Sequence, residues 1–209
     1  MNMIKFEHTD VYGFEAAIRG MRNPKNSWDK SDSKCVPGTY SVSIGPDDRK
    51  LMRSLIAAGD DHGKFTRMII VTTDIIAPLY WWKEFDTYKV GTVADSCSTM
   101  HKLADRDLLP EDFSTEHLYD ECYGWMCDII DLLNDYRRQF KNSGEKKDWW
   151  QMIQLLPSSF NQKRTVQLNY QVLRRIYRAR KDHKLDEWRD FCNIWIPGLP
   201  FAEELITGV

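Results

Sequence analysis

Several polar stretches of this chain carry side chains whose types and spacing could bind or transform a ligand. A loop rich in Gly and Pro brings Arg19 and Arg22 together with Asn23, Ser27 and Asp29. Arginine pairs in loops often hold phosphate, because each guanidinium presents several donors in one plane. An ordinary solvated surface loop is the alternative, and the sequence leaves both open.

A second stretch, Asp95-Ser96-Cys97-Ser98-Thr99, places a thiol among hydroxyls. Cys97 is a candidate nucleophile only if His101, one helical turn away, lowers its pKa. The alternative is a plain polar loop. The other cysteines and the five histidines form no C-x-x-C or H-E-x-x-H pattern, so we expect neither a metal site nor a disulfide framework, and a reduced, cytoplasmic protein.

The third stretch, residues 81–88, reads Trp-Trp-Lys-Glu-Phe-Asp-Thr-Tyr. Consecutive tryptophans cannot face the same way on a helix, so we expect one in the core and one at an interface or pocket. Lys83 and Asp86 stand three residues apart, which suits either a helix salt bridge or part of a ligand site. The basic run 174–181 ends in Arg180 and is compatible with a solvated helix end.

Composition excludes several classes of protein. The chain has 209 residues, 42% of them apolar, and 29 basic side chains against 31 acidic ones. The near balance of charge argues against a nucleic-acid-binding protein, and no apolar run is long enough for a membrane span. The N-terminus shows no signal-peptide pattern. Twelve per cent aromatic residues require a core, which argues against disorder.

The elements that must position these residues follow from periodicity and turn signals. We expect strands at 39–44 and 67–73, and helices at 46–58, from Asp74 to near Gly91, at 114–140, before Pro157, at 165–180 and at 185–195. The helix at 114–140 has apolar residues at steps of four and three, a seam typical of helix packing: Leu118, Cys122, Trp125, Ile129, Leu132 and Tyr136. The sum is a helix-rich α/β (α+β) protein forming a single domain over residues 1–209, with its few strands before residue 75.

Four landmarks in this order resemble the flavin-dependent thymidylate synthases, the ThyX family. They are the helix 51–56 followed by His62-Gly63-Lys64-Phe65, the stretch 68–85, Leu155-Leu156-Pro157, and Leu168-Asn169-Tyr170-Gln171-Val172-Leu173 followed by Ala179-Arg180, His183 and Glu187. The match runs from about Leu51 to the C-terminus. The resemblance implies a ThyX-like fold with a small sheet and long packed helices.

The family's chemistry is methylation of dUMP with methylenetetrahydrofolate and reduced flavin, in sites built between the subunits of a homotetramer. The resemblance thus implies FAD as the cofactor and dUMP and a folate as partners. It places Lys83, Asp86, Asn169 and His183 toward the cofactor and Ser96, Ser98 and Arg180 toward the nucleotide. No catalytic residue is assigned.

The chain differs from the family in the residues that give the family's site its positive charge. The family's R-H-R-x-x-S motif corresponds here to Lys83-Glu84-Phe85-Asp86-Thr87-Tyr88, which replaces a cationic cluster by one cation and two acids. Carboxylates repel phosphate and pyrophosphate. The sequence therefore predicts a ThyX relative, a thymidylate synthase-like methyltransferase if active, with that activity weak or lost. The alternative is a repurposed oligomer that binds another nucleotide-like ligand.

Overall fold

The centre of the molecule is a four-stranded antiparallel sheet. The computed structural model describes residues 4–36 and 41–208. The sheet has the order β1-β4-β6-β5, and its strands are β1 (Lys5–Tyr12), β4 (Ile70–Pro78), β5 (Thr92–Ser96) and β6 (Asn161–Asn169). A small hairpin of β2 (Lys34–Cys35) and β3 (Val42–Ser43) lies at one end. Part of the expected strand 39–44 lies outside the described residues.

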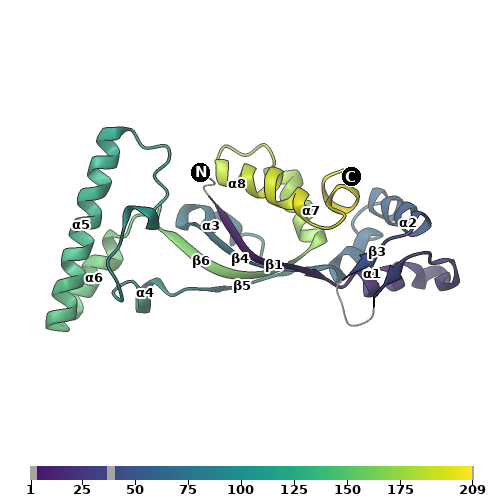
Figure 1. Ribbon diagram of the computed structural model, residues 1–209, viewed down its shortest axis with the longest axis horizontal. Coiled ribbons are helices and arrows are strands. Elements are labelled where there is room, and N and C mark those ends of the chain that lie inside the picture. The colour runs from purple at the N-terminus through teal and green to yellow at the C-terminus, as the bar shows by residue number, and fades with distance from the viewer. Residues whose placement is uncertain (1–3, 37–40, 209) are drawn as a thin grey trace.

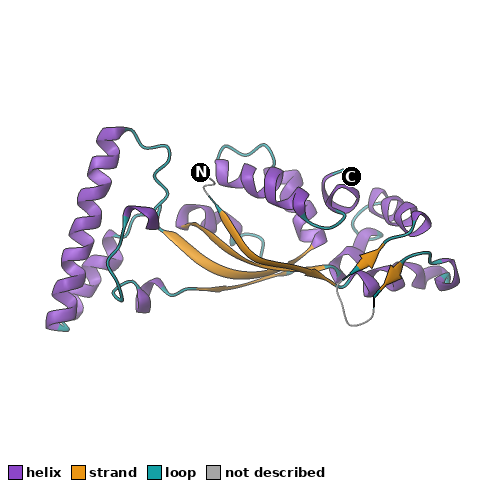
Figure 2. Ribbon diagram, in the orientation of Figure 1, coloured by secondary structure: helices purple, strands orange, loops and turns teal. Residues whose placement is uncertain are grey.

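The helices gather along one face of the sheet and at its two ends (Figures 1 and 2). They are α1 (Phe14–Arg22), α2 (Pro46–Ala57), α3 (Leu79–Phe85), α4 (Thr99–Lys102), α5 (Asp120–Ser143), α6 (Lys146–Leu155), α7 (Tyr170–Arg180) and α8 (Asp186–Asp190), with π-helical turns at Phe191–Trp195 and Glu203–Thr207. The main core lies between the sheet and α7, α8 and the C-terminal turns. The expected helix-rich α/β fold with a small sheet is confirmed.

Strand β4 sits in the middle of the sheet and extends further than the sequence predicts. Its residues alternate between buried and half-buried positions, with Val71, Ile75 and Ala77 fully buried. Asp74 was expected to cap a helix, and this prediction is wrong. Asp74 pairs with Glu7 on β1 and Thr165 on β6, so neighbours on both sides hold it in the ladder, and α3 begins only at Leu79.

Strand β6 corrects a second prediction. Residues 165–169 were read as the start of a helix, yet they complete β6, which pairs along its length with β4 and in part with β5. The helix begins at Tyr170, after Asn169 accepts a hydrogen bond from the backbone N–H of Val172. This is N-cap geometry. Strands β5 and β6 also overturn the expectation that all strands precede residue 75.

Helices α5 and α6 pack on each other at the far end of the molecule from α1 and α2 (Figure 1). Residues 114–119 do not join α5 as predicted, because the backbone N–H of Ser114 donates to Ser159 and its hydroxyl to Asn161, which ties this segment to the start of β6. The helix ends at Gly144, whose positive φ of 68° and hydrogen bond to Phe140 close it.

The expected seam of α5 does not pack inside this chain. The second core cluster uses Ile130, Leu133 and Met152, together with the half-buried Met126 and Phe140. Ile130 and Leu133 each follow a seam residue by one position, which turns about 100° around the helix axis. Tyr136 reaches this cluster, whereas Trp125 is 64% exposed and Leu132 42%.

Helices α2 and α6 agree with the sequence, whereas the predicted helix 185–195 divides into α8 and a π-helical turn, and α1 and α4 were not predicted. Helix α2 spans the predicted segment and ends before Gly59, which has a φ of 106°. Helix α6 ends at Leu155 as predicted. Among the described residues, no helix combines the length and the apolar character needed to cross a membrane.

Candidate functional site

Helix α3 is fixed by three aromatic side chains on its inner face. Trp81, Trp82 and Phe85 are each at most 1% exposed. Trp81 and Phe85 pack against Trp188 and Phe191, and Trp82 packs against Trp81 and Phe85. Both tryptophans are therefore in the core, which contradicts the expectation that one faces an interface or pocket. With the aromatic side chains anchored inside, Glu84 of α3 faces the end of α7 and α8.

Glu84 on α3 is the point where three donors meet. Its Oε2 atom accepts from Arg180 Nη1 at 2.9 Å and from the Trp188 indole nitrogen at 3.1 Å, and it lies 3.3 Å from His183 Nε2. The three donors come from the end of α7, the following turn and α8. Such a convergence is an anion-binding arrangement, and a carboxylate of the same chain occupies it.

The ring of His183 has a defined tautomer in this arrangement. Its Nδ1 atom accepts a hydrogen bond from the backbone N–H of Leu185 at 3.1 Å. The proton of the neutral imidazole must then sit on Nε2, which is the nitrogen that faces Glu84. His183 can donate to the carboxylate without being charged.

Arg180 is held on several sides. Its Nε atom donates to the Tyr88 hydroxyl at 3.0 Å, and its guanidinium lies 5.3 Å from the centre of the Trp188 ring. With the ion pair to Glu84, these contacts leave the Arg180 side chain only 24% exposed. The plain interpretation of Arg180 as a solvated helix end is therefore wrong.

A second ion pair connects α3 to the sheet. Asp86 accepts from Arg164 Nη1 at 2.7 Å, so it pairs across the sheet rather than with Lys83 three residues away. Arg164 also donates through Nε to Gln162, and its guanidinium stacks 4.2 Å from the centre of the Trp82 ring. Arg164 is not among the predicted site residues, because the sequence pattern of residues 165–180 resembles one helix and gives no sign of the strand that carries Arg164.

An open cavity of about 370 Å³ lies beside this ion pair. It is lined by Phe85, Asp86, Tyr88, Lys89, Thr92, Ala94 and Arg164. Two aromatic rings, two hydroxyls, one carboxylate and two cations thus surround one hollow. Sequence analysis selected Asp86 and Tyr88 in it, but not Lys89 or Arg164.

The other predicted site residues take different places. Asn169 caps α7 near Gly91, where an added Cβ would lie 2.9 Å from the Asn169 amide nitrogen. Ser96 is exposed at the end of β5, paired with Arg164 in the ladder. Ser98 caps α4 and lines a separate hollow of about 230 Å³. Lys83 is exposed on α3.

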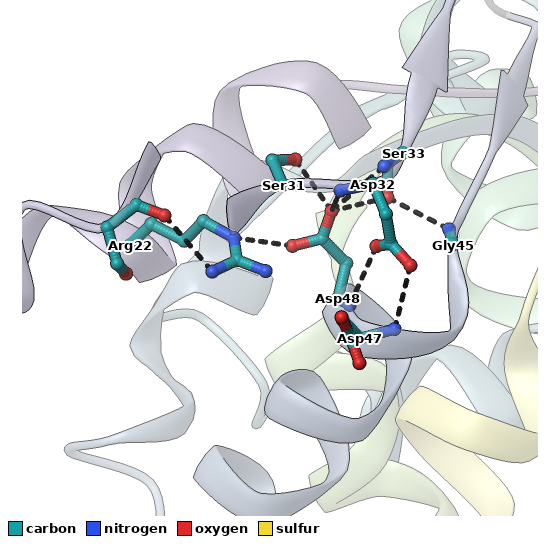
Figure 3. A network of polar contacts seen from close by, with 8 residues as sticks. Arg22, Ser31, Asp32, Ser33, Gly45, Asp47 and Asp48 are labelled. Carbon is teal, nitrogen blue, oxygen red and sulfur yellow. Dashed lines mark hydrogen bonds and ion pairs between the residues drawn. The ribbon is translucent and has the colours of Figure 1, made fainter. Parts of the chain in front are cut away.

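The two arginines assigned to a loop near the N-terminus lie instead in the last turn of α1, and their contacts have a structural explanation. Arg22 is 5% exposed and donates through Nε to Asp48, which is completely buried (Figure 3). Ser31 and Ser33 also donate to Asp48. Burial raises the pKa of the Asp48 carboxyl, but these hydrogen bonds outweigh it and hold the pKa below its usual value. Within the described part of the chain, Arg19 forms an ion pair with Glu15 at the surface.

One cluster of metal-ligand types occurs among the described residues: Glu7, His8 and Asp74. The ammonium group of Lys163 lies 2.9 Å from both carboxylates. A cation from the chain itself therefore already bridges the two carboxylates and balances one of their two charges. Sequence analysis did not select it, because its members lie on two strands that are distant in the sequence.

Comparison with known proteins identifies the fold. No family model matches the chain, and no curated protein matches it. The structure is similar to the flavin-dependent thymidylate synthase ThyX of Helicobacter pylori in complex with FAD and dUMP. The TM-score is 0.71, sequence identity is 14%, and the match covers 96% of this chain and 95% of that one. For a second structure of that enzyme with FAD and dUMP, the TM-score is 0.70 and sequence identity is 16%. That match covers 96% of this chain and 94% of the other.

The chain has the ThyX fold. The predicted resemblance is thereby confirmed for the fold, which extends over nearly the whole chain and not only from Leu51 onward. At 14–16% identity the fold alone is shown.

Proposed function

We propose that this protein binds a nucleotide-like small molecule at the cavity between α3, β5 and β6, and that thymidylate synthesis is weak or lost. The observation that supports the proposal is that carboxylates at the end of α3 pair with two arginines: Asp86 with Arg164, which lines the cavity, and Glu84 with Arg180, which contacts Tyr88 in the cavity wall. A site of this kind can accept an aromatic ring against Phe85 and Tyr88. It offers few unpaired cationic donors to a polyphosphate.

The fit of FAD and dUMP can be judged from the donors. Both ligands carry phosphate groups, which are bound well where several donors are available. Here the Arg180, His183 and Trp188 donors converge on Glu84. A phosphate would have to displace this carboxylate or bind beside it. The residues therefore do not fit a pyrophosphate as they stand, and no reaction step is assigned to this chain.

Within this proposal the family roles remain as candidates. FAD is the cofactor to test first, with Lys83, Asp86, Asn169 and His183 near it. Ser96, Ser98 and Arg180 are the candidates for the nucleotide, and methylenetetrahydrofolate is the candidate carbon donor. We further propose a single domain that assembles into a homo-oligomer, a tetramer by analogy with the family, in the cytoplasm.

The second candidate function is full thymidylate synthase activity as a methyltransferase. The extent of the fold favours it, because the similarity covers 95% of a ThyX chain that binds FAD and dUMP. Lys89 lines the cavity and has no ion pair within the described part of the chain. For this function, Lys89 would have to supply the positive charge that the carboxylates of Glu84 and Asp86 neutralise on the arginines.

The deciding experiment combines spectroscopy with genetics. The purified protein is examined for the visible absorbance of an oxidised flavin, and then titrated with FAD, dUMP and uridine. Growth of thymidine-requiring cells expressing the protein is measured in parallel. Growth without thymidine and tight flavin binding would establish the full enzyme. Nucleotide binding without growth supports the proposal, and a folded protein that binds none of the three probes contradicts it.

A further inference from the structure

A second cavity lies beside α1, at the far end of the molecule from α5 (Figure 1). Its volume is about 320 Å³, and it shares no lining residue with the cavity beside α3. One face of α1 and the segment that follows it form the lining: Glu15, Ile18, Arg19, Arg22, Trp28, Ser31, Ser33 and Cys35. The four residues from α1 stand at positions i, i+3, i+4 and i+7, so the helix presents them on one side.

Arg22 brings a fixed guanidinium to this cavity. The side chain is 5% exposed, and it donates through Nε to Asp48 at 2.7 Å and through Nη1 to the backbone carbonyl of Ser27 at 3.1 Å (Figure 3). Its third nitrogen, Nη2, makes no hydrogen bond to the part of the chain that the structure describes. A donor that is already held in place loses little conformational entropy when a ligand accepts from it. Arg22 therefore offers one preorganised donor for a carboxylate.

Trp28 gives the cavity an apolar wall. It is 49% exposed, and its indole nitrogen donates to the side chain of Asn23 at 2.8 Å, which restrains the ring. Ile18, which is 5% exposed, adds a second apolar side chain to the lining. A restrained aromatic ring that is only half-covered is a contact surface for an apolar group of a ligand.

The charges of the cavity cancel in pairs. Glu15 and Arg19 lie 3.6 Å apart with side chains 72% and 65% exposed, so this ion pair is weak and exchanges partners easily. The charge of Arg22 is balanced by Asp48 behind it. A phosphate ion would be repelled by Glu15 without gaining net positive charge. A zwitterion, in contrast, offers a partner to Glu15 and to the two arginines at once.

We propose that this cavity binds a free α-amino acid with a large apolar side chain. Its carboxylate accepts from Arg22 Nη2 and from Arg19, its ammonium group donates to Glu15, and its side chain lies against Trp28. An α-amino acid carries both charges on one carbon, so it replaces the contact between Glu15 and Arg19 without leaving either charge unpaired. The inference does not depend on the ligand proposed for the cavity beside α3.

The first test uses phenylalanine and two analogues that each lack one charge. In spectra of the ¹⁵N-labelled protein, the indole signal of Trp28 is identified as the one that Trp28→Ala removes. Phenylalanine should shift this signal with a dissociation constant of about 1 mM or below. Phenylpropionate lacks the ammonium group and phenethylamine lacks the carboxylate, so each should bind at least tenfold more weakly.

The outcomes of this titration distinguish the classes of ligand. Phenylpropionate or inorganic phosphate binding as tightly as phenylalanine would indicate a simple anion site and overturn the inference. Phenethylamine binding as tightly would overturn it as well, because no carboxylate would then be recognised. A Trp28 signal that does not respond to phenylalanine at the limit of its solubility has the same consequence.

The second test assigns the ammonium group to Glu15. Glu15→Gln keeps the size of the side chain and removes its charge, so phenylalanine should bind about tenfold more weakly, whereas phenylpropionate should bind no more weakly than to wild type. Arg19→Gln should weaken the binding of both ligands. The matched control is Arg138→Gln, because Arg138 forms an exposed ion pair with Asp135 on α5; it should change neither affinity.

Circular dichroism melting verifies that the three variants fold. If Glu15 only stabilised the end of α1, its replacement would affect both ligands alike. A folded Glu15→Gln variant that binds phenylalanine as wild type does, or that loses both ligands equally, would overturn the assignment.

Discussion

The Glu84 carboxylate lies 2.9 Å from the Arg180 guanidinium, so a side chain of α3 holds the cation at the end of α7. The same carboxylate accepts from Trp188 and faces the protonated nitrogen of His183. This one contact fixes the junction of α3, α7 and α8, and it decides how much positive charge the neighbouring cavity can offer to a ligand.

Replacing Glu84 should open the donor group to an external anion. Glu84→Gln keeps the size of the side chain and an acceptor for Trp188, but removes its negative charge. We expect the affinity for a nucleoside monophosphate to rise about tenfold, because Arg180 gains a phosphate in place of its internal partner. Isothermal titration with dUMP measures this, and Glu116→Gln, at an exposed acid before α5, is the control. A variant with unchanged or weaker binding would show that Glu84 does not compete with the ligand.

Removing Arg180 should weaken nucleotide binding, whereas replacing Glu84 should strengthen it. If Arg180 contributes one charge-assisted hydrogen bond to a nucleotide phosphate, Arg180→Ala should weaken binding about tenfold to a hundredfold. Because Glu84 remains partly exposed to water, stability should fall by only about 1 kcal/mol or less. Titration and thermal melting measure the two effects separately. Equal nucleotide affinity in wild type and variant would restrict Arg180 to its internal contacts.

The hydrogen-bond network of Asp48 should control how the free energy of unfolding changes at acidic pH. Because its pKa is lowered in the folded protein, ionised Asp48 contributes stability above its unfolded pKa of about 3.9, and this contribution is lost as the pH falls through the lower folded value. Asp48→Asn leaves Arg22 buried without its partner, so unfolding at neutral pH should need about 3 kcal/mol less. The variant should also lose less of its remaining stability upon acidification.

Urea unfolding at several pH values measures both effects. The control is Asp105→Asn, because Asp105 pairs with Lys102 at the surface. A buried network should cost far more to break than this exposed pair. Similar effects of the two substitutions would mean that Asp48 is not stabilised as Figure 3 indicates.

Asn169 can be tested for two separate roles. Its side-chain oxygen caps α7, so Asn169→Ala should lower stability by about 1 kcal/mol, and Asn169→Asp should keep the cap. Asp lacks the amide donor, however. If Asn169 also binds a ligand through that donor, Asn169→Asp should bind less tightly while its melting temperature stays near that of wild type. Full ligand affinity in the Asp variant would leave Asn169 with the capping role alone.

The fold class and several element boundaries could be predicted from the sequence because their causes are local. Helix α2 begins at Pro46 and stops before Gly59, and α6 stops two residues before Pro157, as turn and cap chemistry require. The ordered landmarks that resemble ThyX enzymes predicted the fold. Each of these inferences needs only neighbours in the chain or a familiar order of motifs.

The errors arose where a distant segment decides the local structure. Asp74 resembles a helix cap in sequence, yet Glu7 and Thr165 pair with it in the sheet. Residues 165–169 resemble the start of a helix, but β4 and β5 hold them as strand β6. Ladder partners 67 to 99 residues away do not contribute to any local pattern.

The sequence by itself determined that this chain forms a helix-rich α/β fold, that α3 carries two acids where the ThyX motif carries cations, and that α5 has an apolar seam. Only the tertiary structure decided that Glu84 pairs with Arg180, that Asp86 pairs with Arg164 and not with Lys83, and that the α5 seam faces outward. The reason is physical. Composition and spacing fix which charges and apolar faces exist, whereas their partners depend on which segments the sheet and the aromatic core bring together.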